Sequence, residues 1–244
     1  MSLTLTRVVH SCVLLDFDGV TFLTDPWFSE RRGYLHGEPL ACTPDKLPEL
    51  AGVLATHGHY DHYDLEAFAA YPSRDVPMVV KRGIGDQARD KGYTHVVELD
   101  AWESVEIAGA RITAAPARHA VPQVTFVVEK DGTTVFFGGD TMRIPELDEV
   151  ARRFPEIDLA LMPVNGLYIR PALNRQVVMN AEEAAELTAV LRPRVAVPIH
   201  YAFTAGRVRD RLLLGYDGTP ERFAAAVPEG IEVRVLATGE PLTI

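Results

Sequence analysis

Alternation of apolar and polar residues marks several candidate β-strands along the chain. Three such runs are interrupted by a two-residue turn, at Asp18-Gly19, Ala108-Gly109 and Asp131-Gly132, and β-branched or aromatic residues flank each turn. A two-residue turn that ends in glycine suits a tight hairpin, because glycine adopts positive φ without steric cost. We therefore expect three antiparallel hairpins.

Short apolar runs that end near turns or polar residues add further strands. They cover residues 51–57, 76–81, 96–100, 158–164 and 194–200. Helical segments are interleaved with these strands, at residues 65–70, 85–91, 145–153, 181–191 and 220–226. Asn180, with Glu183 three residues later, predicts a capping box at the start of the fourth helix.

This mixture of hairpins and strand–helix units predicts an α/β (α+β) fold. Two sheets packed together with helices outside would form a four-layer αββα sandwich. A three-layer α/β sheet would produce a similar order of elements, so that alternative stays open. The chain has 244 residues, 47% of them hydrophobic, without a linker or a repeat, and we expect a single domain over residues 1–244.

Charge and cysteine content narrow the range of partners. The net charge of −10 argues against a broad phosphate-binding surface, and hence against nucleic acid. No apolar run reaches transmembrane length and the first residues lack the features of a signal peptide, so we expect no membrane association. Cys12 and Cys42 form neither a disulfide framework nor a thiolate metal motif, and the cytoplasm is the simplest location.

The segment HGHYDH, residues 57–62, concentrates three histidines and one aspartate. Neutral imidazole and carboxylate groups bind zinc and similar divalent ions. On an extended loop His57 and His59 point to one side, whereas Asp61 and His62 point elsewhere, which suggests two ions. Two ions need more ligands than this loop supplies. Polar residues that follow other apolar runs are candidates for the rest: Asp25, His119, Asp140 and His200.

Five short motifs together resemble those of the metallo-β-lactamase superfamily. They span nearly the whole chain: Asp25 in TDP, the HGHYDH segment, His119, Asp140 in GGDT and His200 in PIHY. The resemblance implies a first metal ion with three histidine ligands: His57, His59 and His119. It implies a second ion with three further ligands: Asp61, His62 and His200. Asp140 would bridge both ions, and Asp25 would support the ligand loop as an outer carboxylate.

Within this superfamily, residues 162–187 resemble the L-ascorbate-6-phosphate lactonase-like branch. The resemblance implies a metal-dependent hydrolase with two divalent ions, and His/Asp ligation favours zinc, although manganese or iron accept the same groups. Two ions about 3.5–4 Å apart can hold a shared hydroxide that would attack a small lactone, ester or phosphodiester. We expect Asp61, Asp140 and Tyr168 to take part in catalysis, with a small molecule as substrate.

Additional candidates for substrate binding lie outside these motifs. The loop after residues 158–164 carries Asn165, Tyr168 and Arg170, which could bind a leaving group or an anion, or could form a solvated loop. His36 could line the mouth of the pocket together with nearby aromatic residues, or it could anchor its own loop.

Three more polar aromatic side chains have mainly structural interpretations. Tyr201, next to His200, could donate a hydrogen bond to a ligand from behind, or could belong to the core. His10 and His95 are interpreted as structural, although His10 could lie near the site.

Two other functions compete with the hydrolase. One is a mononuclear iron oxidoreductase of the persulfide dioxygenase type on the same fold. The other is a non-catalytic scaffold, which the complete set of ligands disfavours.

A homo-oligomer is a further expectation that follows only from the frequency of oligomers among soluble enzymes.

Overall fold

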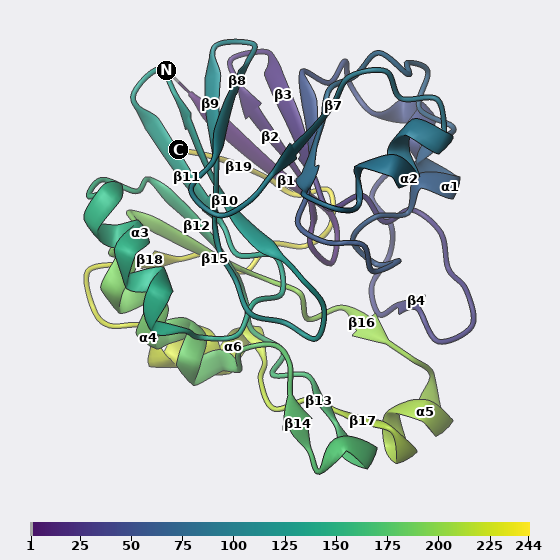
Figure 1. Cartoon of the computed structure of the whole chain (residues 1–244). Helices are drawn as coiled ribbons and strands as arrows, with labels where there is room; N and C mark the ends of the chain where they lie inside the picture. Colours follow the sequence, from purple (N-terminus) through teal and green to yellow (C-terminus); the bar gives the residue numbers. More distant parts are fainter. Residues whose placement is uncertain (1) are drawn as a thin grey trace.

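Two seven-stranded β-sheets form the centre of the computed structural model, which describes residues 2–244 (Figure 1). The first sheet has the strand order β19-β1-β2-β3-β5-β6-β7. Its strands are β1 (Leu3–Val9), β2 (Cys12–Phe17), β3 (Val20–Thr24), β5 (Gly52–Ala55), β6 (Met78–Lys81), β7 (Val96–Leu99) and β19 (Pro241–Thr243). The pairing of β1 with β19 brings the two ends of the chain together at one side of this sheet.

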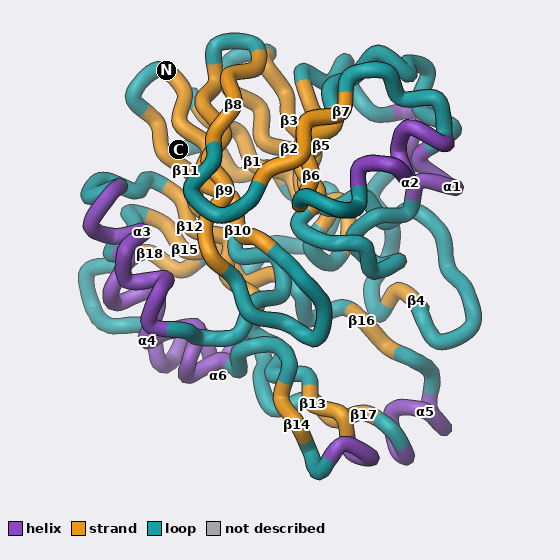
Figure 2. Tube along the Cα trace, viewed as in Figure 1, coloured by secondary structure: helices purple, strands orange, loops and turns teal. Residues whose placement is uncertain are grey.

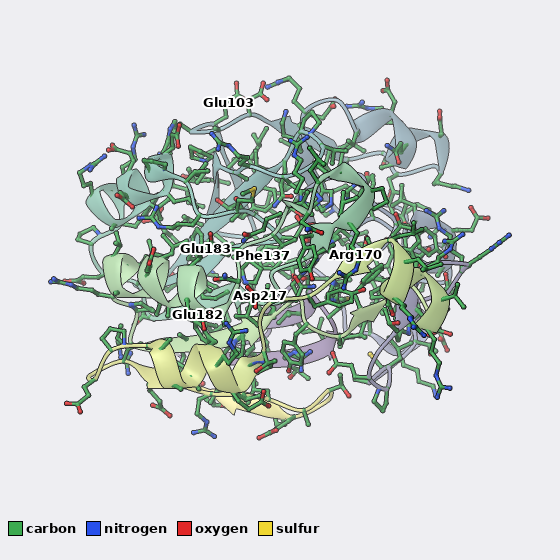
Figure 3. The ribbon with its side chains drawn as sticks, turned by 90° about the horizontal axis from the view of Figure 1, so that it is seen from below. Glu103, Phe137, Arg170, Glu182, Glu183 and Asp217 are labelled. Carbon is green, nitrogen blue, oxygen red and sulfur yellow. The ribbon has the colours of Figure 1, made fainter. Side chains whose placement is uncertain are left out.

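The second sheet has the strand order β18-β15-β12-β11-β10-β9-β8. Its strands are β8 (Ser104–Ile107), β9 (Ala110–Pro116), β10 (Val124–Lys130), β11 (Thr133–Phe137), β12 (Leu159–Pro163), β15 (Val195–Ile199) and β18 (Glu232–Val233). Side chains alternate between its two faces: in β11, Val135 and Phe137 (labelled in Figure 3) join the core between the sheets, whereas Phe136 faces the outer helices.

Helices cover the outer face of each sheet (Figure 1). The first sheet is covered by α1 (Leu65–Phe68) and α2 (Gly85–Asp90), and the second by α3 (Asp148–Arg153), α4 (Ala181–Leu191) and α6 (Pro220–Ala226). Three 3-10 turns accompany them: η1 (Pro44–Lys46), η2 (Pro145–Leu147) and η3 (Arg170–Ala172). The layers are therefore αββα, as the sequence predicts. None of the helices within residues 2–244 is both long and apolar enough to span a membrane.

Local sequence signals explain several of these elements. All three predicted hairpins are present, as β2–β3, β8–β9 and β10–β11. Both residues of each turn have positive φ, for example 47° at Asp131 and 83° at Gly132, as a tight hairpin requires. The capping box is also confirmed, because Asn180 accepts from the Glu183 backbone and Glu183 (labelled in Figure 3) accepts from the Asn180 backbone.

Other elements are absent from the prediction. Among the strands and α-helices, they are β1, β18, β19, α5 (Arg207–Leu212) and two small sheets, one of β13 (Tyr168–Ile169), β14 (Arg175–Gln176) and β17 (Leu214–Gly215), the other of β4 (Leu35–His36) and β16 (Phe203–Thr204). Strands of two residues are too short to show a hydrophobic period, and α5 has no buried residue that could mark one face of a helix. In β1 the polar Thr4 and Thr6 alternate with buried leucines, but the buried Arg7 interrupts this pattern.

Strand direction explains where the functional site lies. Strand β3 is parallel to β5, and β1 runs in the same direction because it is antiparallel to β2, which is antiparallel to β3. In the second sheet β11, β12 and β15 are mutually parallel. The carboxyl ends of these strands open into loops on the side where the small strands β13, β14 and β16 lie (Figure 2). Side chains in those loops can therefore converge.

Candidate metal centre

Two groups of metal-binding side chains lie at the carboxyl ends of the parallel strands. In each group, one donor atom from every residue lies within 4.8 Å of the others. The first cluster consists of His57, His59, His119 and Asp140, and the second cluster consists of His10, Asp61, His62 and His200. Six of the eight histidines of the chain are thus gathered at one place.

Asp140 lies between the two clusters. Its Oδ2 atom is 3.2 Å from His119 Nε2 and 3.6 Å from His57 Nε2 in the first cluster. The same oxygen is 3.7 Å from His62 Nε2 and 3.7 Å from His200 Nε2 in the second cluster. Because ions such as zinc bind oxygen and nitrogen at about 2.0–2.2 Å, donor atoms at these separations can share an ion. One carboxylate oxygen therefore faces ligands of both predicted ions.

The glycines before Asp140 bring its loop close to the HGHYDH loop. Gly139 has a φ of 60°, and a Cβ atom there would lie 2.9 Å from Thr56 Cγ2. A Cβ atom on Gly138 would lie 2.7 Å from Pro163 Cδ. Such separations are below van der Waals contact, so Gly139 is needed where this loop approaches Thr56, next to the HGHYDH loop, and Gly138 where it packs against β12.

Asp25 supports both clusters from behind. It is fully buried and accepts three hydrogen bonds: from Thr56 N at 2.8 Å, from Thr56 Oγ1 at 2.8 Å and from His62 Nδ1 at 2.6 Å. Because the Thr56 hydroxyl donates to Asp25, it can accept from His57 Nδ1, which lies 3.0 Å away. One carboxylate thus orients His62 directly and His57 through Thr56, and leaves both Nε2 atoms free to face the centre.

A backbone carbonyl orients a third histidine in the same manner. His119 Nδ1 donates to Val177 O at 2.8 Å, so its Nε2 atom carries the lone pair and points toward Asp140. Burial lowers the pKa of His119 to about 3, and it lowers the pKa of His57 and His200 well below the ordinary value. These three rings are therefore neutral at pH 7, which is the form that binds a metal ion.

His62, in contrast to these three histidines, favours its protonated form. Burial lowers its pKa, but the carboxylates of Asp25, Asp140 and Asp61 outweigh burial and raise the pKa to about 10. Burial raises the pKa of Asp140 to about 8. Metal binding to these two residues therefore has to compete with protons.

Unpartnered buried atoms test whether these residues fit metal ions. Among residues 2–244, the buried atoms without a hydrogen-bond partner include these at the centre: His57 Nε2, His62 Nε2, His200 Nε2, Asp61 Oδ1 and Asp140 Oδ1. Buried polar groups of a folded protein are normally satisfied, and each unsatisfied group costs free energy. Imidazole nitrogens and carboxylate oxygens that converge without partners fit divalent ions such as zinc, manganese or iron.

A cavity of about 330 Å³ opens onto the centre. Ligand residues from both clusters reach it: His59, Asp61, His119, Asp140 and His200. The rest of the wall is apolar and comes from the β13–β14–β17 sheet with the residues that flank it, from the end of α5 and from β16. Its side chains are Leu167, Ile169, Val177, Phe203, Leu213 and Leu214. Arg209 of α5 and Tyr34 add polar groups at this wall.

The structure does not bring Tyr168, Arg170 or Asn165 into this cavity. Strand alternation turns Leu167 and Ile169 toward the cavity, so Tyr168 points to the other side, where it packs against Gly215. Arg170 (labelled in Figure 3) is exposed, stacks on Tyr168 and donates to Leu214 O. Buried Asn165 accepts from Leu167 N and shapes its own loop. The expected roles of these side chains at the reaction centre have no support in this geometry.

His36 and Tyr201 also lie outside the cavity lining. His36 packs edge-on against Trp27, with ring centroids 4.2 Å apart. The Tyr201 hydroxyl accepts from Arg7, which also pairs with Glu38, and it does not contact a ligand residue directly. The hydrogen bonds of the Tyr201 hydroxyl therefore connect it to Arg7 and the Leu236 carbonyl and not to the proposed ligands.

His10 belongs to the second cluster, although the sequence interpretation made it structural. It directly follows β1, as Asp25 follows β3 and His200 follows β15. The signal that could have revealed it is the alternation LTLTRVV before it, because a polar residue at the end of such a strand matches the position of the other ligands.

A four-layer αββα sandwich with a His/Asp cluster at its carboxyl edge defines a protein of the metallo-β-lactamase type. The family model of the beta-lactamase superfamily domain matches residues 21–201, and the chain belongs to this superfamily. The chain is 28% identical to a UPF0173 metal-dependent hydrolase of Methanopyrus kandleri, over 97% of each chain.

Solved structures share the fold. Igni18, a metallo hydrolase of Ignicoccus hospitalis, has a TM-score of 0.78 and 23% identity, over 100% of this chain and 99% of the other. CmlA, a diiron β-hydroxylase of Streptomyces venezuelae, has a TM-score of 0.76 and 19% identity, over 99% of this chain and 54% of the other. The fold therefore accommodates different chemistries, and the residues of the site must decide between them.

Proposed function

We propose that this protein is a metal-dependent hydrolase that binds two divalent ions, with zinc preferred over manganese or iron. The observation that carries the proposal is the position of Asp140 Oδ2, which lies 3.2–3.7 Å from four histidine nitrogens, two in each cluster. A carboxylate oxygen shared in this way is suited to bridge two ions. The name of the Methanopyrus relative, a metal-dependent hydrolase, supports the same reaction class.

When bound, two such ions supply Lewis acidity and lower the pKa of a bound water toward neutrality. The protein orients the histidine ligands of these ions. Asp25 and Thr56 hold His57 and His62 in the tautomer whose Nε2 atom faces the centre, and Val177 O does so for His119. Asp61 and Asp140 contribute charge, which balances the cations.

The cavity favours a small, largely neutral lactone or ester over a phosphodiester. Its wall opposite the ligands is apolar, so it suits an acyl or alkyl group of the substrate. Arg209, whose Nη1 donates to Arg32 O, is the only lysine or arginine that lines this cavity within residues 2–244. The two ions would themselves attract an anionic phosphodiester, so the preference rests on the apolar wall, where Arg209 alone could bind a phosphate oxygen that the ions do not hold.

Elemental analysis of protein purified without added metal tests the proposal, paired with activity on lactones, aryl esters and bis-(p-nitrophenyl) phosphate. We expect about two zinc or manganese ions per chain and hydrolysis that a chelator abolishes, faster on lactones and esters than on the phosphodiester. His57→Ala should lose metal and activity. His95→Ala is the matched control, because His95 is exposed and its ring is hydrogen-bonded to Asp75 O, away from both clusters.

Other results would redirect the assignment. A single iron ion without hydrolysis would indicate the mononuclear iron oxidoreductase. Absence of metal after reconstitution would indicate a scaffold and contradict the proposal. Faster turnover of bis-(p-nitrophenyl) phosphate than of any lactone or ester would keep the hydrolase and overturn the substrate preference.

A further inference from the structure

His10 is a buried histidine that no structural interaction of its ring explains. It is fully buried, and neither Nδ1 nor Nε2 has a hydrogen-bond partner within the part of the chain that the structure describes. Its ring lies over His200, with centroids 4.1 Å apart, and edge-on to Trp27 at 5.3 Å. A phenyl ring would make the same contacts without burying two unsatisfied nitrogens. Packing alone therefore does not account for a histidine here.

The position of His10 relative to Asp61 matches that of an expected ligand. His10 Nε2 lies 3.8 Å from Asp61 Oδ2, and His62 Nε2 lies 3.8 Å from the same oxygen. This separation is longer than a hydrogen bond, but it suits two donor atoms that share one ion at about 2.0–2.2 Å each. His10 thus faces the second cluster as His62 does.

The backbone of His10 is held in place by two other parts of the site. Its N–H donates to Glu38 Oε1 at 2.9 Å, and Glu38 forms an ion pair with the fully buried Arg7. Its carbonyl accepts from His200 N at 3.5 Å. His10 and the second cluster are therefore linked through the main chain as well as through their side chains.

His10 also shares an unusual backbone conformation with two other residues of the proposed site. It has a φ of 52°, and Asp25 and His200 have φ values of 33° and 58°. Each is the first residue after a strand, β1, β3 or β15. Left-handed backbone at residues other than glycine is uncommon and clusters at functional sites. At all three positions this turn directs the side chain toward the shared edge of the sheets.

We propose that His10 is a protein ligand of the second metal ion, together with Asp61, His62, His200 and the bridging Asp140. The inference rests on the proposed two-metal site and goes beyond the seven ligands that the motifs supply. The second ion would then have five protein ligands against four for the first. The first ion would keep more open positions for water and substrate, and its ligands His59 and His119 line the cavity.

Cobalt binding to the complete protein tests this assignment. His10→Phe keeps the ring contacts and removes both nitrogens. His36→Phe is the matched control, because it replaces another histidine whose ring packs against Trp27 but which lies outside both clusters. Equilibrium dialysis with Co²⁺ measures the number and affinity of the ions, and proton NMR of the cobalt protein detects the shifted N–H resonances of ligating imidazoles.

We expect His10→Phe to bind the first cobalt ion with wild-type affinity, which also shows that the variant is folded. The second ion should bind at least tenfold more weakly, and at saturating cobalt the spectrum should lack one shifted imidazole N–H resonance. His36→Phe should change neither. If His10→Phe does not fold, His10→Gln serves with the same readouts, since glutamine cannot supply an imidazole resonance.

Two outcomes would overturn the assignment. If His10→Phe binds two cobalt ions with unchanged affinity and an unchanged set of shifted resonances, His10 is not a ligand, while the proposed hydrolase stands. If the wild type itself binds no ion at the second cluster, the two-metal site fails and the inference fails with it.

Discussion

Replacing Asp25 by asparagine tests how the protein prepares its metal ligands. Asp25 does not line the cavity at the centre and lies behind the ligand loop, so the substitution leaves every proposed ligand in place. The substitution changes only the acceptor of the hydrogen bonds that Thr56 and His62 donate. The carboxylate accepts three hydrogen bonds, from Thr56 N, Thr56 Oγ1 and His62 Nδ1.

Asparagine supplies one acceptor oxygen where the carboxylate supplies two, so in either orientation its NH₂ group faces at least one donor. With its oxygen in the place of Oδ1, it accepts from Thr56 N and its NH₂ group faces Thr56 Oγ1 and His62 Nδ1. His62 escapes this conflict by moving its proton from Nδ1 to Nε2, the atom that faces Asp140 and Asp61. A protonated ring nitrogen cannot bind an ion. Loss of an outer carboxylate typically costs 10–100-fold in metal affinity, which corresponds to about 1.4–2.7 kcal/mol.

A competition titration of Asp25→Asn with zinc and a chromophoric chelator measures this loss, and we expect it mainly at the second ion. The stabilisation by zinc at a fixed, saturating concentration should fall by the same 1.4–2.7 kcal/mol, or about 10–100-fold in binding. Thr56→Val is the matched comparison, because it removes only the hydroxyl between Asp25 and His57 and should weaken the first ion. Wild-type affinity at both ions in Asp25→Asn would refute the reasoning.

Three further predictions concern the bridge, the metals and the fold. Asp140→Asn should reduce turnover by orders of magnitude while the far-UV circular dichroism stays native; near-normal turnover of the metal-replete variant would show that Asp140 does not bridge. Exhaustive chelation should lower the melting temperature and abolish hydrolysis, and zinc should restore both, whereas chelation without effect would argue against metal. Asn180→Ala should lower the free energy of unfolding by about 0.5–2 kcal/mol without changing zinc affinity, because it removes only the cap of α4.

Much of the site was predictable because its residues follow strands with strong hydrophobic patterns. The runs before Asp25, His57, Asp140 and His200 are apolar or β-branched, and each polar residue directly or closely follows one. Parallel strands bring their carboxyl ends to one edge, so such residues can meet although they are far apart in sequence. The layers were predictable for the same reason, since hairpins and strand–helix units alternate along the chain.

The substrate side of the site was not predictable because it depends on very short elements. Which of Leu167, Tyr168 and Ile169 faces the cavity depends on the register of a two-residue strand, and a shift of one residue would exchange the faces. The helix that supplies Arg209 has six residues and no buried one. Neither feature leaves a period in the sequence that could be detected.

His10 shows a different limit, which is set by contacts between distant residues. Arg7 interrupts the apolar pattern of β1, yet it is fully buried, because its two Nη atoms donate to Glu38, Tyr201 and the Leu236 carbonyl. A buried arginine is stable only when such partners are present, and no local pattern announces partners so remote in sequence. Since Glu38 also accepts from the His10 backbone, the same Arg7–Glu38 ion pair that interrupts the apolar pattern of β1 holds His10 beside the second cluster.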